Sequence, residues 1–449
     1  MATKIGYVAQ IFPYLSETFV YREVKTLRAK GLDVQTFSTW QPKLDELSAE
    51  ARSLVDDTFY IFPLNKVQFV RSHAMFLATR PLPYLRALLF CLSRPHKTWK
   101  NRLRTLMHFA QAVYMAQAVE QRGVEHLHVH FALNATTIAM VIYHLTGVTF
   151  SFTAHANDLF CNPILLTEKI EESAFIIAIS EYNKRFMYNL LPQQKIAEKI
   201  NIVHCGIDIA RYAPTDKGTS DKRPTIVAVG RLVEKKGYPY LIKACRVLVD
   251  HGYDFHCLII GGGPEEAALR QLVTEHDLTE YITLTGVVFQ EEMRNYLSRA
   301  DLTVLPCVVA QNQDMDGIPN TLMEAMAMEI PAISTQVSGI PELIEDGKTG
   351  LLVPPEDEVA LAEAIARLLN DEPLRTKLGQ AGRVKVTTEF EINKNTDQLL
   401  DIFRTQIQPK SSTLLARQKH TQRLTFFSLF LLISGLLLWL GYRGRSNRT

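Results

Sequence analysis

Short apolar runs alternate with amphipathic segments along most of the chain. In the first half, apolar runs of strand length begin near residues 4, 34, 125, 148 and 174, and a helical pattern covers residues 17–30. The second half repeats the alternation with six runs, at residues 225–230, 255–263, 282–286, 302–306, 331–335 and 349–354. Alternating strands and helices are typical of a parallel sheet with helices on both faces. The pattern therefore predicts an α/β fold of two Rossmann-like, doubly wound parallel-sheet domains.

The domain boundaries follow from where each alternating series begins and ends. We assign residues 1–205 to an N-terminal domain, 206–222 to a linker, 223–388 to a C-terminal domain and 389–407 to a closing helix. A chain of 449 residues, 47% apolar and 21% charged, is long enough for two hydrophobic cores. Ligands of such sheets bind at the carboxyl ends of the strands, near the topological switch point. We therefore expect the site in a cleft between the two facing sheets.

One segment of the first half combines basic and apolar residues without any acid. Residues 58–119 contain nine Lys and Arg residues among Phe, Leu and Trp, and neither Asp nor Glu. Basic side chains near anionic lipid headgroups each contribute roughly 1 kcal/mol to membrane binding, and apolar ones enter the interface. We predict a membrane-facing insertion at about residues 60–105. The alternative is an ordinary helical insertion whose acidic partners lie elsewhere in the fold.

The C-terminal residues differ in composition from the rest of the chain. Residues 425–442 carry no charge, and as a helix they would span about 27 Å, close to the hydrocarbon core of a bilayer. A basic linker at 408–424 precedes them and further arginines follow, so the flanking charges do not orient the segment. We predict a transmembrane anchor at 425–442, with a buried C-terminal core helix as the alternative.

Net charge and cysteine content indicate the cellular compartment and limit the kinds of binding partner. A formal net charge of +2 gives no support for nucleic-acid binding. Six scattered cysteines without a C-x-x-C pair indicate a reducing compartment, and the N-terminus lacks the apolar run of a secretory signal. We expect the two α/β domains in the cytoplasm, held at the membrane by the C-terminal helix.

The sequence VGRLVEKKG at 229–237 joins a predicted strand to a predicted helix. A diphosphate at a helix N-terminus meets free backbone N–H groups, and Arg and Lys add further donors. Arg231 and Lys236 are therefore candidates for diphosphate binding, with two solvated loop cations as the alternative. The glycine turn at 261–263 is a weaker indication, because it lacks the full dinucleotide fingerprint and the P-loop lysine.

Two carboxylates flank the start of another predicted helix. Asp316 lies just outside a helix that starts at Pro319, whose first backbone N–H groups are free, and Glu324 lies roughly 7 Å further along the axis. Glu324 could accept hydrogen bonds from vicinal ribose hydroxyls, so the arrangement suits a nucleotide sugar, with Asp316 on the hexose. One alternative is a D-x-D metal site formed by Asp314 and Asp316. The other is a helix N-cap acid with an unrelated surface acid.

The N-terminal half offers candidates for the opposite side of the cleft. In TAHANDLF, His155 and Asp158 end a strand, and His155 would face the cleft and bind the transferred sugar or its phosphate, unless it is a structural histidine. HLHVH at 126–130 places three histidines on one strand face, but zinc needs a ligand from another element, so we predict no metal. Ser16 is a natural N-cap. Glu17 either contacts a substrate or favours the helix dipole.

Together these motifs resemble the family 4 (group 1) retaining glycosyltransferases. The resemblance is carried by GRLVEKKG, GGGP, LTG, DGIPNTLMEAMA, PAIST and GIPELIEDGKTGLLV, and spans about residues 3–405. FPYLSETFV, HVHFA and TAHANDLF further resemble the exopolysaccharide branch, such as the colanic-acid-type transferases. The resemblance implies a GT-B architecture of two facing Rossmann-like domains, to which the composition adds a C-terminal transmembrane helix.

Residue roles follow from the same resemblance. It implies that Arg231 and Lys236 hold the donor diphosphate, that Glu324 binds the ribose, and that Asp316 and His155 contact the transferred sugar. Further donor-binding residues lie in the glycine turns and at the helix start: Gly230, Gly262, Gly263, Gly317, Ile318, Pro319 and Asn320. Acceptor-side residues are Ser16, Glu17 and Asp158. Many family members have Glu at the position of Asp316, and a glycine pair in place of Ser16 and Glu17.

The expected function is transfer of a sugar from a nucleotide-diphosphate sugar to a glycan or lipid-linked acceptor, in polysaccharide or glycolipid biosynthesis. The family resemblance implies retention of configuration. We expect no cofactor beyond the nucleotide sugar as co-substrate and no metal, and we expect a membrane but no nucleic acid among the partners. The alternatives are a nucleotide-sugar epimerase and a non-catalytic, membrane-associated assembly partner. An NAD oxidoreductase is disfavoured by the lack of G-x-G-x-x-G after the first strand.

Overall fold

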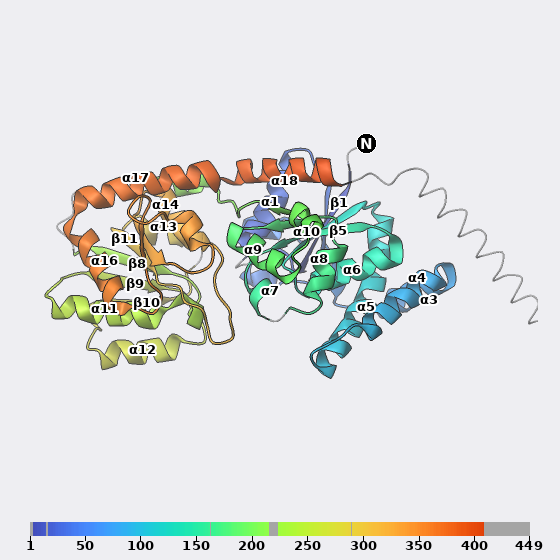
Figure 1. The fold of residues 1–449 in the computed structure, drawn as a ribbon, viewed down its shortest axis with the longest axis horizontal. Helices are drawn as coiled ribbons and strands as arrows, with labels where there is room; N and C mark the ends of the chain where they lie inside the picture. Colours follow the sequence, from blue (N-terminus) through green and yellow to red (C-terminus); the bar gives the residue numbers. More distant parts are fainter. Residues whose placement is uncertain (1–2, 15–16, 162, 215–222, 289, 408–449) are drawn as a thin grey trace, which may run out of the picture.

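The computed structural model describes residues 3–14, 17–161, 163–214, 223–288 and 290–407. These ranges form two α/β domains that lie side by side (Figure 1). Each domain contains one sheet in which every pair of neighbouring strands is parallel. The prediction of two doubly wound parallel-sheet domains is confirmed.

The N-terminal sheet has seven strands in the order β3-β2-β1-β4-β5-β6-β7. Its strands are β1 (Ile5–Ile11), β2 (Val34–Trp40), β3 (Phe59–Phe62), β4 (His126–His130), β5 (Thr149–Ala154), β6 (Ile176–Ala178) and β7 (Ile200–Ile202). The order of the strands reverses between β1 and β4, so the loops after these two strands diverge to opposite sides and leave a binding crevice.

Helices cover both faces of this sheet (Figure 1). They are α1 (Thr18–Ala29), α2 (Ala49–Arg52), α3 (Lys66–Thr79), α4 (Pro81–Ser93), α5 (Trp99–Gln121), α6 (Asn134–Thr146), α7 (Asn157–Phe160), α8 (Leu166–Glu172), α9 (Glu181–Leu190) and α10 (Gln194–Lys199). Helix α6 is apolar on nearly all sides and is buried between the sheet and α5.

The C-terminal sheet has six strands in the order β10-β9-β8-β11-β12-β13. They are β8 (Thr225–Val229), β9 (His256–Ile260), β10 (Ile282–Gly286), β11 (Leu302–Leu305), β12 (Ala332–Thr335) and β13 (Leu351–Val353). The helices are α11 (Tyr238–Asp250), α12 (Glu266–Glu275), α13 (Gln290–Leu297), α14 (Asn320–Ala327), α15 (Ile340–Leu343), α16 (Glu358–Asn370) and α17 (Glu372–Glu389). The switch point lies between β8 and β11. The predicted diphosphate-binding sequence at 229–237 follows β8, and the segment with Asp314 and Asp316 follows β11.

Helix α18 (Ile392–Gln406) and a helix cap are among the features that join the domains. The helix follows α17 along one edge of both domains (Figure 1) and buries Leu400 and Phe403 in the N-terminal core. In addition, the Glu342 carboxylate accepts hydrogen bonds from the backbone N–H groups of Glu181 and Tyr182 at 2.8 and 3.0 Å, and so caps α9 across the domain boundary. The loops at the carboxyl ends of the two sheets are thereby held against each other.

The acid-free segment is not a single insertion. Its residues 59–62 form β3, which pairs with β2 and belongs to the sheet, and the second half of α5 is buried. The protruding part consists of α3, α4 and the first half of α5 (Figure 1). Arg80 pairs with Glu120 at 2.7 Å and Arg94 with Glu168 at 3.9 Å, so two of its cations do have acidic partners elsewhere, as the alternative interpretation expected.

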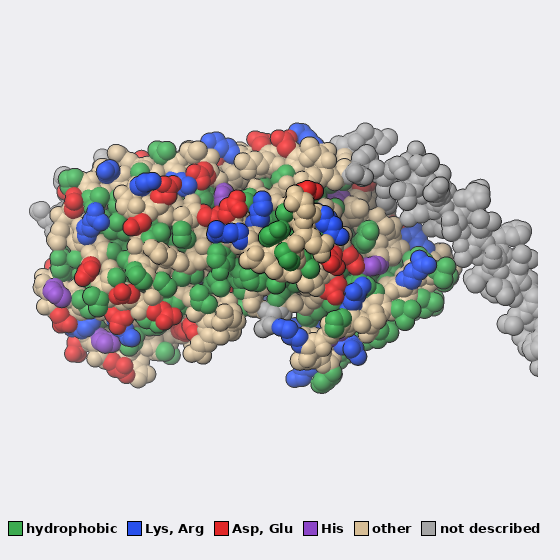
Figure 2. All heavy atoms as spheres, in the orientation of Figure 1, with side chains coloured by type: hydrophobic (Ala, Val, Ile, Leu, Met, Phe, Trp, Pro, Cys, Tyr) green, Lys and Arg blue, Asp and Glu red, His purple; other side chains and the backbone are tan. Residues whose placement is uncertain are grey.

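Large apolar side chains are exposed along this protruding part at helical spacings, and basic ones lie among them (Figure 2). We call the following residues the insertion surface: Val67, Val70, Leu77, Leu82, Leu85, Leu89, Leu92, Trp99, Leu103 and Met107. Such a stripe of exposed apolar side chains is unusual for a surface that faces only water.

Within the described residues, each helix taken alone is too short or too polar to cross a bilayer. Only α3 and α4 together reach the required length and composition, and the pair is bent by 113°. The predicted basic linker at 408–424 and the predicted anchor at 425–442 lie outside the described residues.

Candidate active site

Two turns of the C-terminal domain pack against each other at the carboxyl ends of β8 and β9. Gly230 and Arg231 follow β8, and the backbone N–H of Leu232 donates to the carbonyl of Gly262 at 3.0 Å. A Cβ atom on Gly263 would collide with the Leu232 carbonyl group, so the close approach of the two turns requires glycine there. Arg231 is exposed beside these turns, and the structure shows no ion pair between it and another described residue.

Two adjacent lysines face the acids of the DMD sequence. In the short helix η3 (Glu234–Lys236), Lys236 Nζ lies 2.5 Å from Asp316 Oδ2. Lys235 Nζ lies 3.2 Å from Asp316 Oδ1 and 3.1 Å from Asp314 Oδ1. Burial raises the pKa of Asp316, but the charges of Lys236 and Lys235 outweigh it and lower this pKa to about 2. The Asp316 carboxylate is therefore ionised at every physiological pH.

This cluster joins residues that are 80 positions apart in the sequence. Lys236 and Asp316 were predicted to share a crevice, and the structure places them in contact. Lys235 was missed, although the Lys-Lys pair in VEKKG was a visible signal for a second cation. Both acids of the D-x-D alternative lie within ion-pair distance of Lys235.

Glu324 lies on the first turns of α14, one of whose ends faces the same crevice. The helix begins at Asn320, with Pro319 at the N-cap. The Glu324 side chain is buried, so the interpretation of it as a surface acid is wrong. Burial raises the pKa of Glu324 to about 7, although a hydrogen bond from Tyr212 and the charge of Arg22 act in the opposite direction. Arg22 belongs to α1, so this carboxylate senses the N-terminal domain as well.

The raised pKa of Glu324 predicts pH-dependent donor binding. As the pH falls from 8 to 6, protonation of Glu324 would remove the predicted acceptor for ribose hydroxyls, and the Kd of a nucleotide sugar should rise by up to about tenfold. The diphosphate diester of such a donor does not titrate in this range. Calorimetric titration at both pH values measures the effect.

The variant Glu324→Gln isolates this group, because its amide does not titrate. We expect its Kd to be equal at pH 6 and pH 8. The same pH dependence in the wild type and the variant would contradict the role of Glu324. The free energy of unfolding depends on pH in the opposite direction to that of an acid whose pKa is lowered by folding. The stabilising contribution of Glu324 is full below its ordinary pKa of 4.5 and is lost as the pH rises through about 7.

His155 lies at the end of β5 with its ring directed into the N-terminal domain. The residue is 6% exposed, the ring Nε2 lies 3.2 Å from His130 Nδ1, and the ring Nδ1 lies 3.7 Å from Cys205 Sγ. Burial holds the pKa of His155 well below its usual value, so the ring is neutral. Its backbone carbonyl borders Gly317 of the other domain. The geometry therefore favours the structural interpretation of the ring, and contact with the sugar stays a prediction.

Asp158 is a structural residue in this fold. The side chain is completely buried, and its carboxylate accepts hydrogen bonds from the backbone N–H groups of Ala132 at 2.7 Å and His155 at 3.0 Å. The buried Lys169 side chain donates to the carbonyl of Ala132 at 2.8 Å, and burial lowers its pKa to about 7 although the charge of Asp158 acts in the opposite direction. The expectation that Asp158 contacts an acceptor is corrected, because no part of this carboxylate reaches the surface.

Glu17 is the N-cap residue of α1, and the helix begins at Thr18. Its side chain makes no capping hydrogen bond. Burial raises the pKa of Glu17 to about 7, opposed by the charge of His130 and reinforced by that of Asp158. The Glu17 side chain thus lies near His130 and Asp158. Ser16, the predicted N-cap, lies outside the described residues.

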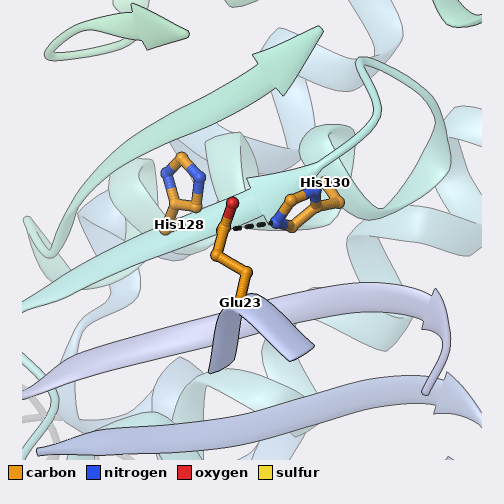
Figure 3. Close-up of side chains that lie close together, drawn as sticks. All are labelled: Glu23, His128 and His130. Atoms are coloured by element: carbon orange, nitrogen blue, oxygen red, sulfur yellow. Dashed lines mark hydrogen bonds and ion pairs between the residues drawn. The ribbon is translucent and has the colours of Figure 1, made fainter. Parts of the chain in front are cut away.

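A cluster that the sequence did not predict joins α1 to β4. Glu23 points between His128 and His130 (Figure 3), and one ligand atom from each of the three residues lies within 4.8 Å of the others. Glu23 thus supplies the possible metal ligand from a second element that the sequence HLHVH does not contain.

Every ring nitrogen in this cluster also has a hydrogen-bond partner. Those of His128 contact the hydroxyls of Ser151 and Thr153 at 2.8 and 2.9 Å. Those of His130 contact His155 and, at 3.1 Å, Glu23. The arrangement is a satisfied buried network, and the expectation of no metal stays a prediction.

Comparison with known proteins identifies the C-terminal domain. Residues 213–385 match the family model described as glycosyl transferases group 1. The chain is 39% identical over 221 residues to the amylovoran biosynthesis glycosyltransferase AmsK of Erwinia amylovora, covering 49% of this chain and 54% of that protein. It is 39% identical over 208 residues to WcaL of Escherichia coli K12, a glycosyltransferase assigned to colanic acid biosynthesis, covering 45% and 51%. The chain thus spans about half the length of these relatives.

The fold is also similar to that of a solved structure. Anabaena Alr3699/HepE, crystallised with UDP-glucose, superposes with a TM-score of 0.65 over 90% of this chain and 99% of that one, at 13% identity. This likeness confirms the GT-B arrangement of two Rossmann-like domains. Residues 213–385 thus match the group 1 glycosyl transferases, and the resemblance of the chain to the exopolysaccharide glycosyltransferases is confirmed.

Proposed function

We propose that this protein transfers a sugar from a nucleotide-diphosphate sugar to a glycan or lipid-linked acceptor in polysaccharide or glycolipid biosynthesis. The cluster of Lys235, Lys236 and Asp316 supports this best, because it combines two cations with an ionised acid beside a glycine turn. The similarity to AmsK and WcaL supports the same class of pathway. It favours glycosyl transfer over the epimerase that the architecture also allows.

The donor would lie across the carboxyl ends of β8 and β11. Arg231 and Lys236, with backbone N–H groups of the turn and of the residues before α14, would neutralise the charge that develops on the leaving diphosphate. Asp316 would accept hydrogen bonds from hexose hydroxyls, and Glu324 from the ribose. HepE binds UDP-glucose within the same fold, which supports this donor class.

We propose that transfer retains the anomeric configuration and needs no metal. As the bond from the anomeric carbon to the diphosphate oxygen breaks, the acceptor hydroxyl would form the new bond on the same face. Its proton would pass to the departing diphosphate oxygen. The lysines at 2.5 and 3.2 Å from Asp316 already supply positive charge where the diphosphate would lie, which supports charge neutralisation by side chains alone.

Donor binding and product analysis test the proposal. A panel of UDP- and GDP-sugars is titrated calorimetrically, and the donor that binds is incubated with lipid-linked acceptors. We expect an acceptor that is heavier by one sugar, with the anomeric configuration of the donor. A changed free nucleotide sugar without an acceptor would indicate an epimerase instead. Absence of binding across the panel would indicate a non-catalytic partner.

We also propose that the two domains lie in the cytoplasm against the membrane surface, held by residues 425–442 and by the insertion surface. The exposed apolar side chains of α3, α4 and α5 support this second contact, because they alternate with exposed cations such as Arg71, Arg86 and Lys100. An anionic headgroup layer would match these cations, and the interface would cover the apolar side chains.

Tryptophan quenching locates the insertion surface relative to a bilayer. Of the three tryptophans, Trp99 lies on this surface and is 72% exposed. In the full chain carrying Trp40→Phe and Trp439→Phe, we expect brominated anionic lipids to quench Trp99 strongly. The matched control keeps Trp40 as its single tryptophan. Trp40 is 46% exposed and lies outside the insertion surface, so it should stay unquenched. Equal quenching of the two reporters, or of neither, would contradict the proposed contact.

A further inference from the structure

A pocket of about 420 Å³ opens in the N-terminal domain. Its walls come from three places: the connection between α4 and α5 with the start of α5, the end of α7 together with residues 163–168, and the last turns of α9. Its volume lies in the range that holds small-molecule ligands. None of the residues discussed above as donor-binding lines it.

One wall of the pocket is apolar and already assembled. Leu159, Phe160, Leu165 and Phe186 line it, and Phe160 meets Phe186 edge-on with ring centroids 4.9 Å apart. Phe160 and Leu165 are themselves buried, so their side chains are fixed by packing. A preformed wall of this kind binds an apolar chain without a large cost in side-chain ordering.

The facing wall is polar and lies in a basic part of the chain. His96, Lys97 and Asn101 line it, and Lys100 and Arg102 are exposed on either side of Asn101. The one acid in the lining, Glu168, accepts a hydrogen bond from Thr167 at 2.9 Å and lies 3.9 Å from Arg94. A ligand that matches both walls carries an apolar chain with an anionic group at one end.

The pocket lies between the insertion surface and the lysine–aspartate cluster. On one side, Leu92 and Trp99 flank the connection that lines the pocket, and both are exposed members of the insertion surface. On the other side, Cys161 follows Phe160 directly, and its Sγ lies 4.0 Å from the Asn312 carbonyl oxygen of the C-terminal domain.

The charges near Cys161 agree with its position beside the C-terminal domain. Burial raises the pKa of Cys161, and among nearby charges Asp314 raises it while Lys235 lowers it. Cys161 therefore lies within the field of the proposed donor site. The apolar wall begins at the residue immediately before it.

We infer that this pocket binds the apolar chain of a lipid-linked acceptor next to its phosphate, and so holds the acceptor between the membrane interface and the donor. The inference rests on the proposed function for its choice of acceptor. The cations around residues 97–102 would bind the phosphate, while the chain would lie against Leu159, Phe160 and Phe186.

Photo-crosslinking without any donor tests the pocket independently of transfer. Full-length protein in phosphatidylcholine nanodiscs is irradiated with a diazirine analogue of farnesyl phosphate, and the labelled peptides are identified by mass spectrometry. We expect labels in residues 159–167 and 186–190, and competition by farnesyl phosphate that exceeds competition by farnesol. Labels confined to the insertion surface, or equal displacement by inorganic phosphate alone, would overturn the inference.

A pair of variants on α9 sharpens the test. Leu190 lines the pocket and is 41% exposed, whereas Tyr188 is 38% exposed on the same helix and does not line it. Leu190→Asp should raise the farnesyl phosphate concentration needed for half-maximal competition about tenfold, because it puts a charge beside the chain. Tyr188→Asp should leave it unchanged, and equal effects would overturn the inference.

A second variant fills the pocket instead of charging it. Asn101 is half-buried in the lining, and Asn101→Trp should abolish labelling of residues 159–167 while the melting temperature stays that of the wild type. Unchanged labelling would overturn the inference. Pocket labelling in a protein that transfers no sugar would refute the proposed function alone, and transfer without pocket labelling would refute the inference alone.

Discussion

Replacing Lys236 by alanine should lower the turnover of sugar transfer by on the order of a hundredfold or more. Lys236 is the cation closest to Asp316, with 2.5 Å between Nζ and Oδ2, and both side chains are largely buried. In so dry a crevice a fixed positive charge stabilises a departing diphosphate far more than it would in water. Initial rates at saturating donor measure the effect.

Folding should be preserved, because Lys235, which lies 3.2 Å from Asp316 Oδ1, remains to pair with this carboxylate. Lys243→Ala is the matched control: this lysine lies on α11, against the ring of Tyr240 and outside the cluster. It should keep the wild-type rate. A Lys236→Ala protein with near-normal turnover would refute the assignment of charge neutralisation to this cluster.

Replacing Asp158 by alanine should lower the free energy of unfolding by about 3 kcal/mol, because it leaves two buried backbone N–H groups without their acceptor. These groups belong to Ala132 and His155, which follow the neighbouring strands β4 and β5. Urea unfolding at pH 8, where Asp158 with a pKa of about 6 is ionised, measures the change.

Asp57→Ala provides the comparison for this effect. Asp57 is 69% exposed and pairs with Arg28 at 3.6 Å, so its loss should cost less than about 1 kcal/mol. Asp158→Asn, which keeps an acceptor oxygen in place, should fall between the two. An Asp158→Ala protein with wild-type stability but impaired acceptor binding would restore the original interpretation of this residue as an acceptor contact.

The architecture was predictable because parallel strands are buried on both faces. Each therefore appears as a continuous apolar run, and the amphipathic segments between them have helical length. This pattern predicted both sheets apart from the short edge strands β3 and β7, and the helix expected after residues 229–237 is α11, Tyr238–Asp250. It misplaced residues 59–62, because an edge strand and the start of a helical insertion have the same composition, and only pairing with β2 separates them.

Part of the site was predictable for a related reason. Residues that follow parallel strands converge at one sheet edge wherever they stand in the sequence, so Lys236 and Asp316 could be assigned to the same crevice. The contribution of Lys235 was not predictable, because it depends on the short helix η3, which directs both Lys235 and Lys236 toward Asp316.

The sequence by itself determined the two-domain α/β plan, the family resemblance and the candidates at the strand ends, because these depend on local periodicity and short motifs. Only the tertiary structure decided that Asp158 serves backbone amides, that Glu23 joins the histidines of β4, and that a pocket separates the insertion surface from the lysine–aspartate cluster. Burial and hydrogen bonding depend on neighbours contributed by distant segments, and no local pattern records them.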